Sequence, residues 1–212
     1  MDSDETLPLR DGNELRVRPI EPGDKGAIRA AFHRLSPESR YRRFFSPLTE
    51  LSERDLAYLT EIDHADHEAL AAIDPAGEEI IGVARYVRTE EARAEASIVV
   101  ADEWHERGIA TGLLERLAGR AREEGITHFV AIALPENKEV IDLFGHLAPE
   151  GMERRTRGGH LELELELPEP GQLEGSALAR ALREAARGVV TMNPWPILVQ
   201  AIRRTWHNRP GR

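Results

Sequence analysis

Apolar and polar residues alternate or recur at helical spacing along most of this chain, and the two periods predict strands and helices. Alternation over residues 15–20 and in LELELEL, residues 161–167, is typical of half-buried strands. Helical spacing follows Asp24, which we expect to cap a helix, and it returns after Gly108. The remaining predicted strands are 68–74, 79–88, 94–100 and 127–134. Three further helices are predicted: one begins at Ser36, one begins at Ser52, and one covers residues 136–147.

The order of these elements predicts the fold class. It runs strand, helices, three strands, helix, strand, helix and two strands, with RTRGGH as a loop before the last strand. This order favours an α+β fold with a central mixed, mostly antiparallel sheet flanked by helices, rather than a regular doubly wound sheet. We expect this domain to occupy residues 1–167.

The C-terminal part has a different pattern. Residues 168–171 form a Pro/Gly linker, and an amphipathic helix and an apolar-then-basic segment broken by prolines follow it. We therefore assign residues 168–212 to a linker and a C-terminal helical extension. Because exposed apolar surfaces usually mark an interface, we expect this extension to dock on its own domain or to form a homodimer with a second copy.

Composition narrows the possible partners and chemistry. Lys and Arg number 28 against 38 Asp and Glu, a formal net charge of −10 at pH 7, which argues against nucleic acid or an anionic membrane as partner. Cysteine is absent, which excludes disulfides, thiolate zinc sites and a cysteine nucleophile. No apolar run approaches the roughly 20 residues of a membrane helix, and the acidic N-terminus is unlike a secretory signal. We expect a soluble cytoplasmic protein.

The segment VADEWHERGIAT, residues 100–111, joins a predicted strand to a predicted helix. The first N–H groups of a helix lack internal partners and carry partial positive charge, so they can bind phosphate. Gly108 and Ala110 would let a diphosphate approach the backbone, and Arg107 and Thr111 add donors. By spacing alone, small residues that merely pack at a helix start are an equally good interpretation.

The same segment carries a family resemblance. HERGIA resembles the Gln/Arg-x-x-Gly-x-Gly/Ala signature of the GNAT N-acetyltransferases, with His105, Gly108 and Ala110 at the marked positions. His105 departs from the usual Gln or Arg, and Ala110 from the commoner Gly. The stretches LRDGNELRVRPIEPGD, GVARYVR, AEASIVVADEWHERGIATGLLERL and LPENKEVIDLF are similar to the bacterial Pat-type protein lysine acetyltransferases.

The resemblance implies a GNAT fold, acetyl-CoA as acyl donor and no metal. It implies that Glu95 is the general base, and that Phe144 stands where many relatives have a tyrosine acid. It also implies that the backbone of Ile98, Val99 and Val100 pairs with the pantetheine arm. The other residues implied to contact the cofactor are His105, Glu106, Arg107, Gly108, Ile109, Ala110, Thr111, Gly112 and Asn137.

These expectations lead to one function and two alternatives. The leading interpretation is transfer of acetyl to a primary amine, in particular a protein lysine side chain, by direct attack on the thioester. The alternatives are a small-amine acetyltransferase and a non-catalytic acyl-CoA-binding sensor.

Several residues outside the signature segment are further candidates for a functional site. We interpret DHADHE, residues 63–68, as a solvated loop rather than a metal site, with His67 or Glu68 as further candidates for the acceptor site. The other candidates for the acceptor cleft are Tyr41, Arg42, Phe45, Arg85 and Tyr86.

Overall fold

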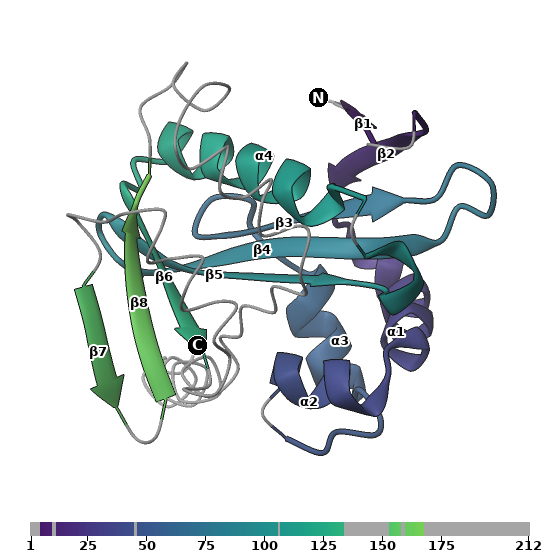
Figure 1. Ribbon diagram of the computed structural model, residues 1–212, viewed down its shortest axis with the longest axis horizontal. Coiled ribbons are helices and arrows are strands. Elements are labelled where there is room, and N and C mark those ends of the chain that lie inside the picture. Colours follow the sequence, from purple (N-terminus) through teal and green to yellow (C-terminus); the bar gives the residue numbers. More distant parts are fainter. Residues whose placement is uncertain are drawn as a thin grey trace, which may run out of the picture.

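Strands form one twisted sheet through the middle of the protein, seen here in a computed structural model (Figure 1). The structure describes residues 5–9, 12–44, 46–105, 107–133, 153–157 and 160–167. The described strands lie in the order β1-β2-β3-β4-β5-β6-β8-β7. Their bounds are β1 Glu5–Pro8, β2 Glu14–Pro19, β3 His67–Ile73, β4 Ile80–Glu90, β5 Arg93–Val100, β6 His128–Ala133, β7 Glu153–Arg157 and β8 His160–Glu166.

Neighbouring strands in this sheet are antiparallel except for β5 and β6, which are parallel. The predicted mixed, mostly antiparallel sheet is therefore confirmed. The parallel pair needs a crossover because its strands run in the same direction. That crossover is α4, which follows β5 and leads back to β6.

Helices cover both faces of the sheet, as the sequence predicts (Figure 1). The helix α4 (Ile109–Glu123) packs on one face. The other face carries α1 (Lys25–Arg34), α2 (Pro37–Phe44) and α3 (Glu53–Thr60). An apolar cluster is buried on each face of the sheet. Successive residues of a strand point to opposite faces, so each central strand contributes alternate residues to the two clusters.

Helix starts follow the capping chemistry that the sequence predicts, with one exception. Ser52 and Asp55 form a reciprocal capping box at α3, and the Ser39 N–H donates to Ser36 Oγ at α2 (3.1 Å). Asp24 is the N-cap residue of α1, as predicted, but its side chain makes no cap bond to that helix. Its carboxylate instead accepts two hydrogen bonds from the Arg18 guanidinium, at 2.7 Å each, and one from the Glu21 amide at 2.8 Å.

Two strands differ from the sequence-based expectation. β1 was not predicted, since it is a four-residue edge strand that ends in proline. It pairs with β2 and buries Leu7 against the core. The RTRGGH segment was predicted to be a loop, yet its first three residues complete β7, which pairs with β8. Arginine-rich strands lack the apolar alternation on which the prediction depends.

The predicted helix at 136–147, the Pro/Gly linker and the C-terminal extension lie outside the described residues. The division into residues 1–167 and 168–212 therefore stays a prediction. No helix in the described part of the chain is long and apolar enough to cross a bilayer.

The close packing of α4 on β1 depends on Gly112. A Cβ placed there would lie 2.2 Å from Leu7 Cδ1 and 3.2 Å from Leu7 Cγ, so the buried leucine would have to move. We expect Gly112→Ala to lower the free energy of unfolding by about 1 kcal/mol, as overpacking does.

The matched control for this change lies on the same helix. A Cβ at Gly119 would meet no atom within 4 Å, so Gly119→Ala should raise stability by about 0.5–1 kcal/mol through helix propensity. Urea unfolding of both variants measures the difference. Equal effects of the two substitutions would show that Leu7 does not constrain α4.

Candidate active site

The sheet opens between β5 and β6. The two strands pair only at Arg93, Ala94 and Glu95, whereas β6 pairs with β8 along its whole length. Beyond Glu95, residues 96–100 of β5 pair with β4 on one side and with no described strand on the other. Figure 1 shows β6 and β8 turning away from β5 at this point. An unpaired strand edge inside a sheet can accept an extended ligand as an added strand.

Glu95 lies at the closed end of this opening. It occupies the last register pair between β5 and β6, opposite Val130, and only 2% of its surface is exposed. Ala94 and Ala96 belong to the α4 cluster. Because neighbouring residues on a strand point to opposite faces, the Glu95 side chain lies on the α1–α3 face. A carboxylate is thus held where the pairing between β5 and β6 ends.

The turn between β5 and α4 presents a helix N-terminus. Gly108 is the N-cap residue of α4 with φ of +91°, a left-handed conformation that glycine adopts without strain. No side chain caps this helix, and the first helical bond runs from Gly112 N to Gly108 O at 3.0 Å. The amides of residues 109–111 precede that bond, so they are the donors available for an anion.

Two side-chain contacts brace this turn. His105 Nε2 donates to the Val100 carbonyl at 2.9 Å, which joins the end of β5 to the turn. The Arg107 guanidinium stacks over the Trp104 ring, with Cζ 4.6 Å from its centroid. His105, the atypical residue of the signature, therefore has a local structural contact. The Val100 oxygen is engaged by this bond, and residues 98–100 also pair with β4 on their other side.

The predicted cofactor contacts fall at these two features. Ile98, Val99 and Val100 lie along the opening, and His105 and residues 107–112 form the turn and the first turn of α4. Ile109 and Gly112 are buried, so any contact of theirs would use the backbone. Residues outside the described set include Glu106, Asn137, Phe144, Phe45 and the side chains of Arg42 and Thr111.

An apolar pocket of about 60 Å³ lies on the α1–α3 face. Its lining residues come from α1, α2, α3, β4 and β5, and they include Phe32, Phe44 and Val99. The pocket exceeds the roughly 10–15 Å³ that one water needs. Val99 and Glu95 share a strand and a face, so the pocket lies along the same side of β5 as the carboxylate.

Arg85 is the charged residue of this pocket, and it is 2% exposed. Its Nη2 donates to the Leu59 carbonyl at 2.7 Å, and its Nη1 donates to His67 Nε2. Burial lowers the pKa of Arg85 to about 10, so the guanidinium stays charged at neutral pH. Burial and the Arg85 charge lower the pKa of His67 to about 2, so its imidazole stays neutral and accepts. Arg85 thus ties the end of α3 to the start of β3.

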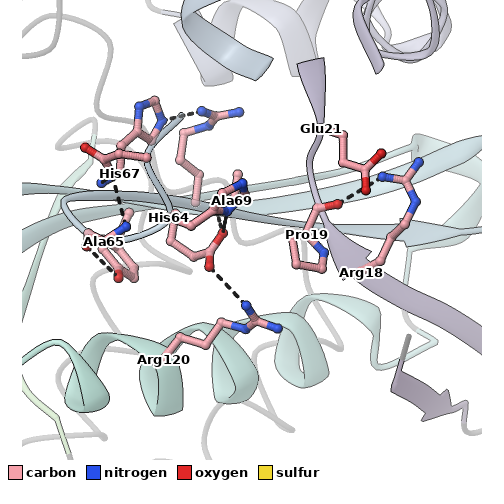
Figure 2. Close-up of polar contacts among 12 residues, drawn as sticks. Arg18, Pro19, Glu21, His64, Ala65, His67, Ala69 and Arg120 are labelled. Atoms are coloured by element: carbon pink, nitrogen blue, oxygen red, sulfur yellow. Dashed lines mark hydrogen bonds and ion pairs between the residues drawn. The ribbon is translucent and has the colours of Figure 1, made fainter. Parts of the chain in front are cut away.

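Tyr86 and Glu68 lie on the opposite face from the pocket. Tyr86 is fully buried in the α4 cluster, and its hydroxyl donates to the Ala65 carbonyl at 2.9 Å. Glu68 is also buried. Its carboxylate accepts hydrogen bonds from the Ala69 amide at 2.7 Å and from the Arg120 guanidinium of α4 at 3.1 Å (Figure 2). Both residues therefore lie away from the pocket, and their place in an acceptor cleft stays a prediction. The solvated loop is present at residues 63–66, whereas His67 and Glu68 already belong to β3.

The described residues contain no group of three or more His, Asp or Glu side chains arranged to hold a metal ion. The sequence reasoning missed Asp102, which connects the turn to α2. It also missed the network of Arg85, His67 and Leu59. Both arise from residues far apart in the chain, and no local pattern signals them.

Comparison with known proteins identifies the family. A sequence model of the Acetyltransferase (GNAT) family matches residues 30–148, more than half of the chain. An acetyltransferase of Pseudomonas aeruginosa is 29% identical over 138 residues, which cover 64% of this chain and 74% of that protein. The acetyltransferase Pat of Mycolicibacterium smegmatis is 32% identical over 142 residues, which cover 65% of this chain and 42% of that protein.

A solved structure agrees with these relatives. The crystal structure of the GNAT domain of S. lividans PAT matches with a TM-score of 0.69 and 35% identity, covering 77% of this chain and 97% of that domain. The open parallel pair, the uncapped start of α4 and these sequence matches all indicate the same family. The chain therefore belongs to the GNAT family and is an acetyltransferase.

Proposed function

We propose that the donor is acetyl-CoA, bound along the opening between β5 and β6. The pantetheine amides would pair with the free edge of β5 at Ile98 and Val99, and the diphosphate would accept from the amides at the start of α4. The unpaired edge and the helix start lie at the two ends of one short segment, which supports a single extended ligand contacting both. Acetyl-CoA has an amide-containing arm next to a diphosphate, so it matches this order.

Glu95 is the proposed general base. An ammonium cannot attack a thioester, so one proton has to leave it first, directly or through a water. Glu95 takes this proton, and the neutral amine attacks the thioester carbonyl. The carbon–sulfur bond then breaks, and coenzyme A leaves as a thiolate, which the modest pKa of a thiol permits without an acid. The nitrogen loses its second proton as the amide forms, and this proton passes to the thiolate directly or through water. The position of the buried Glu95 at the last pair between β5 and β6 is the observation that carries this assignment.

A protein lysine side chain is the proposed acceptor. The resemblance to Pat-type enzymes supports it, since the matches to the Pat of M. smegmatis and to the PAT domain of S. lividans cover 65% and 77% of this chain. The pocket lies on the same face of β5 as Glu95, and its mostly apolar lining suits the methylenes of a lysine side chain. A small amine with a similar chain is the second candidate.

A panel of acceptors distinguishes these functions. Purified protein and acetyl-CoA are mixed with lysine-containing proteins, lysine peptides, amino acids or polyamines, and thiol release is followed. We expect thiol release with a lysine-containing protein and acetyl-lysine in the product. Release with small amines alone would replace the lysine proposal by the second candidate. Binding of coenzyme A without release from any acceptor would leave a sensor.

A further inference from the structure

Asp102 connects the donor turn to a helix on the acceptor side. It begins the 3-10 turn Asp102–Trp104, directly after β5. Its Oδ2 accepts from the Ser36 amide at 2.8 Å, and its Oδ1 accepts from the Ser39 hydroxyl at 2.5 Å. Both serines belong to the start of α2, more than 60 residues earlier in the chain. The Asp102 carboxylate therefore connects the turn before α4, on the proposed donor side, to the start of α2, beside the pocket.

The contact suits a carboxylate specifically. Its two oxygens accept from two donors at the N-terminus of α2, where the helix dipole favours negative charge. Burial alone would raise the pKa of Asp102, but the hydrogen bonds from Ser39 and Ser36 outweigh it, and the pKa is lowered. Asp102 therefore stays ionised at neutral pH.

The helix held by Asp102 covers the pocket. Phe44, at the end of α2, lines the pocket and packs edge-on against Phe32 of α1, with ring centroids 5.4 Å apart. Val99 and Ala101, which immediately precede Asp102, line it from the sheet side. The pocket thus lies between α2 and the end of β5, just before Asp102.

The turn that follows Asp102 is braced into one unit. The His105 amide donates to the Asp102 carbonyl at 3.4 Å, while the His105 ring bonds to Val100 and Arg107 stacks on Trp104. Ligand atoms held at Gly108 would fix this unit, and Asp102 with it.

We propose that Asp102 is a positioning residue that couples the donor site to the acceptor pocket. Occupation of the donor site holds Asp102 in place, and Asp102 holds the start of α2 over the pocket. The acceptor pocket is then fully ordered only when the donor is bound. This inference rests on the proposed donor site but not on the identity of the acceptor.

Amide hydrogen exchange with coenzyme A alone tests the coupling, because the readout needs no acceptor. In the wild-type protein, saturating coenzyme A should slow exchange in α2 at least about fivefold, which is the lower range of usual coupling between sites. In Asp102→Asn, which keeps the shape but places an amide against donors, coenzyme A should still bind while most of this protection is lost. Ser39→Ala removes only the hydroxyl donor and should lose part of the protection, so it carries the test if Asp102→Asn does not fold.

Ser52→Ala is the matched control, because it removes the N-cap of α3 on the same face without contact to the donor turn. It should speed exchange in α3 and leave the coenzyme A protection of α2 intact. If coenzyme A binds the wild type but does not slow α2, or if the Asp102 and Ser39 variants keep full protection, the coupling is overturned while the donor site stands. If coenzyme A does not bind the wild type, the donor site is refuted, and the coupling is refuted with it.

Discussion

Replacing Glu95 by glutamine should lower kcat by about 10²–10⁴-fold near neutral pH, the usual contribution of a positioned general base. The substitution keeps the shape of a side chain that is 2% exposed, so the fold should survive. Acetyl-CoA affinity should change little, since the proposed donor contacts are backbone groups of β5 and α4. Steady-state kinetics with the acceptor found by the panel, together with a binding titration, separate these two effects.

The pH dependence distinguishes a base from a structural residue. A lysine amine has an ordinary pKa of about 10.4, so at higher pH more of it is neutral without any base. The deficit of Glu95→Gln should therefore shrink as pH rises toward 10. Glu90→Gln, at the exposed end of β4, is the matched control and should keep wild-type rates. Full activity of Glu95→Gln at neutral pH would refute the assignment.

Replacing Gly108 by aspartate should weaken acetyl-CoA binding by at least about tenfold, or roughly 1.4 kcal/mol. The new carboxylate would occupy the helix start that we propose for the diphosphate, so like charges would repel where the dipole now attracts an anion. Its φ of +91° also strains a residue that has a Cβ. Calorimetric titration of acetyl-CoA measures the loss.

Gly108→Asn is the control for this strain. Asparagine resembles aspartate in shape and in its tolerance of left-handed backbone, but it carries no charge. It should lose less affinity than Gly108→Asp, and raising the salt concentration should narrow the gap between them. Equal affinities for the two variants would show that no phosphate charge is recognised at this turn.

Elements with a clear period were predictable from the sequence because local pattern decides them. The hairpin of β3 and β4, the face of α4 and the capping box at Ser52 follow directly from spacing and turn chemistry. β1 was missed because four residues ending in proline carry almost no pattern. Asp24 is the N-cap residue of α1, but its side chain binds Arg18 and the Glu21 amide instead of that helix, and no local pattern ranks these partners.

The site divides in the same way. The glycine at the start of α4 was visible as a motif, whereas the opening beside Glu95 was expected only from the family resemblance, since the register of parallel strands has no local signal. Arg85 and Tyr86 were both proposed for one cleft, but neighbours on a strand point to opposite faces, so the two side chains cannot share a cleft on one face of the sheet. The contact of Asp102 with Ser36 joins residues far apart in the chain, so it required the tertiary structure.

The account depends most on a single acetyl-CoA site that combines the free edge of β5 with the start of α4. A titration that compares acetyl-CoA with S-acetyl-pantetheine, which lacks the diphosphate, tests it directly. We predict one acetyl-CoA bound per chain and an affinity for S-acetyl-pantetheine at least about tenfold weaker, or roughly 1.4 kcal/mol. No saturable binding of acetyl-CoA, or equal affinity for the two ligands, would contradict the account.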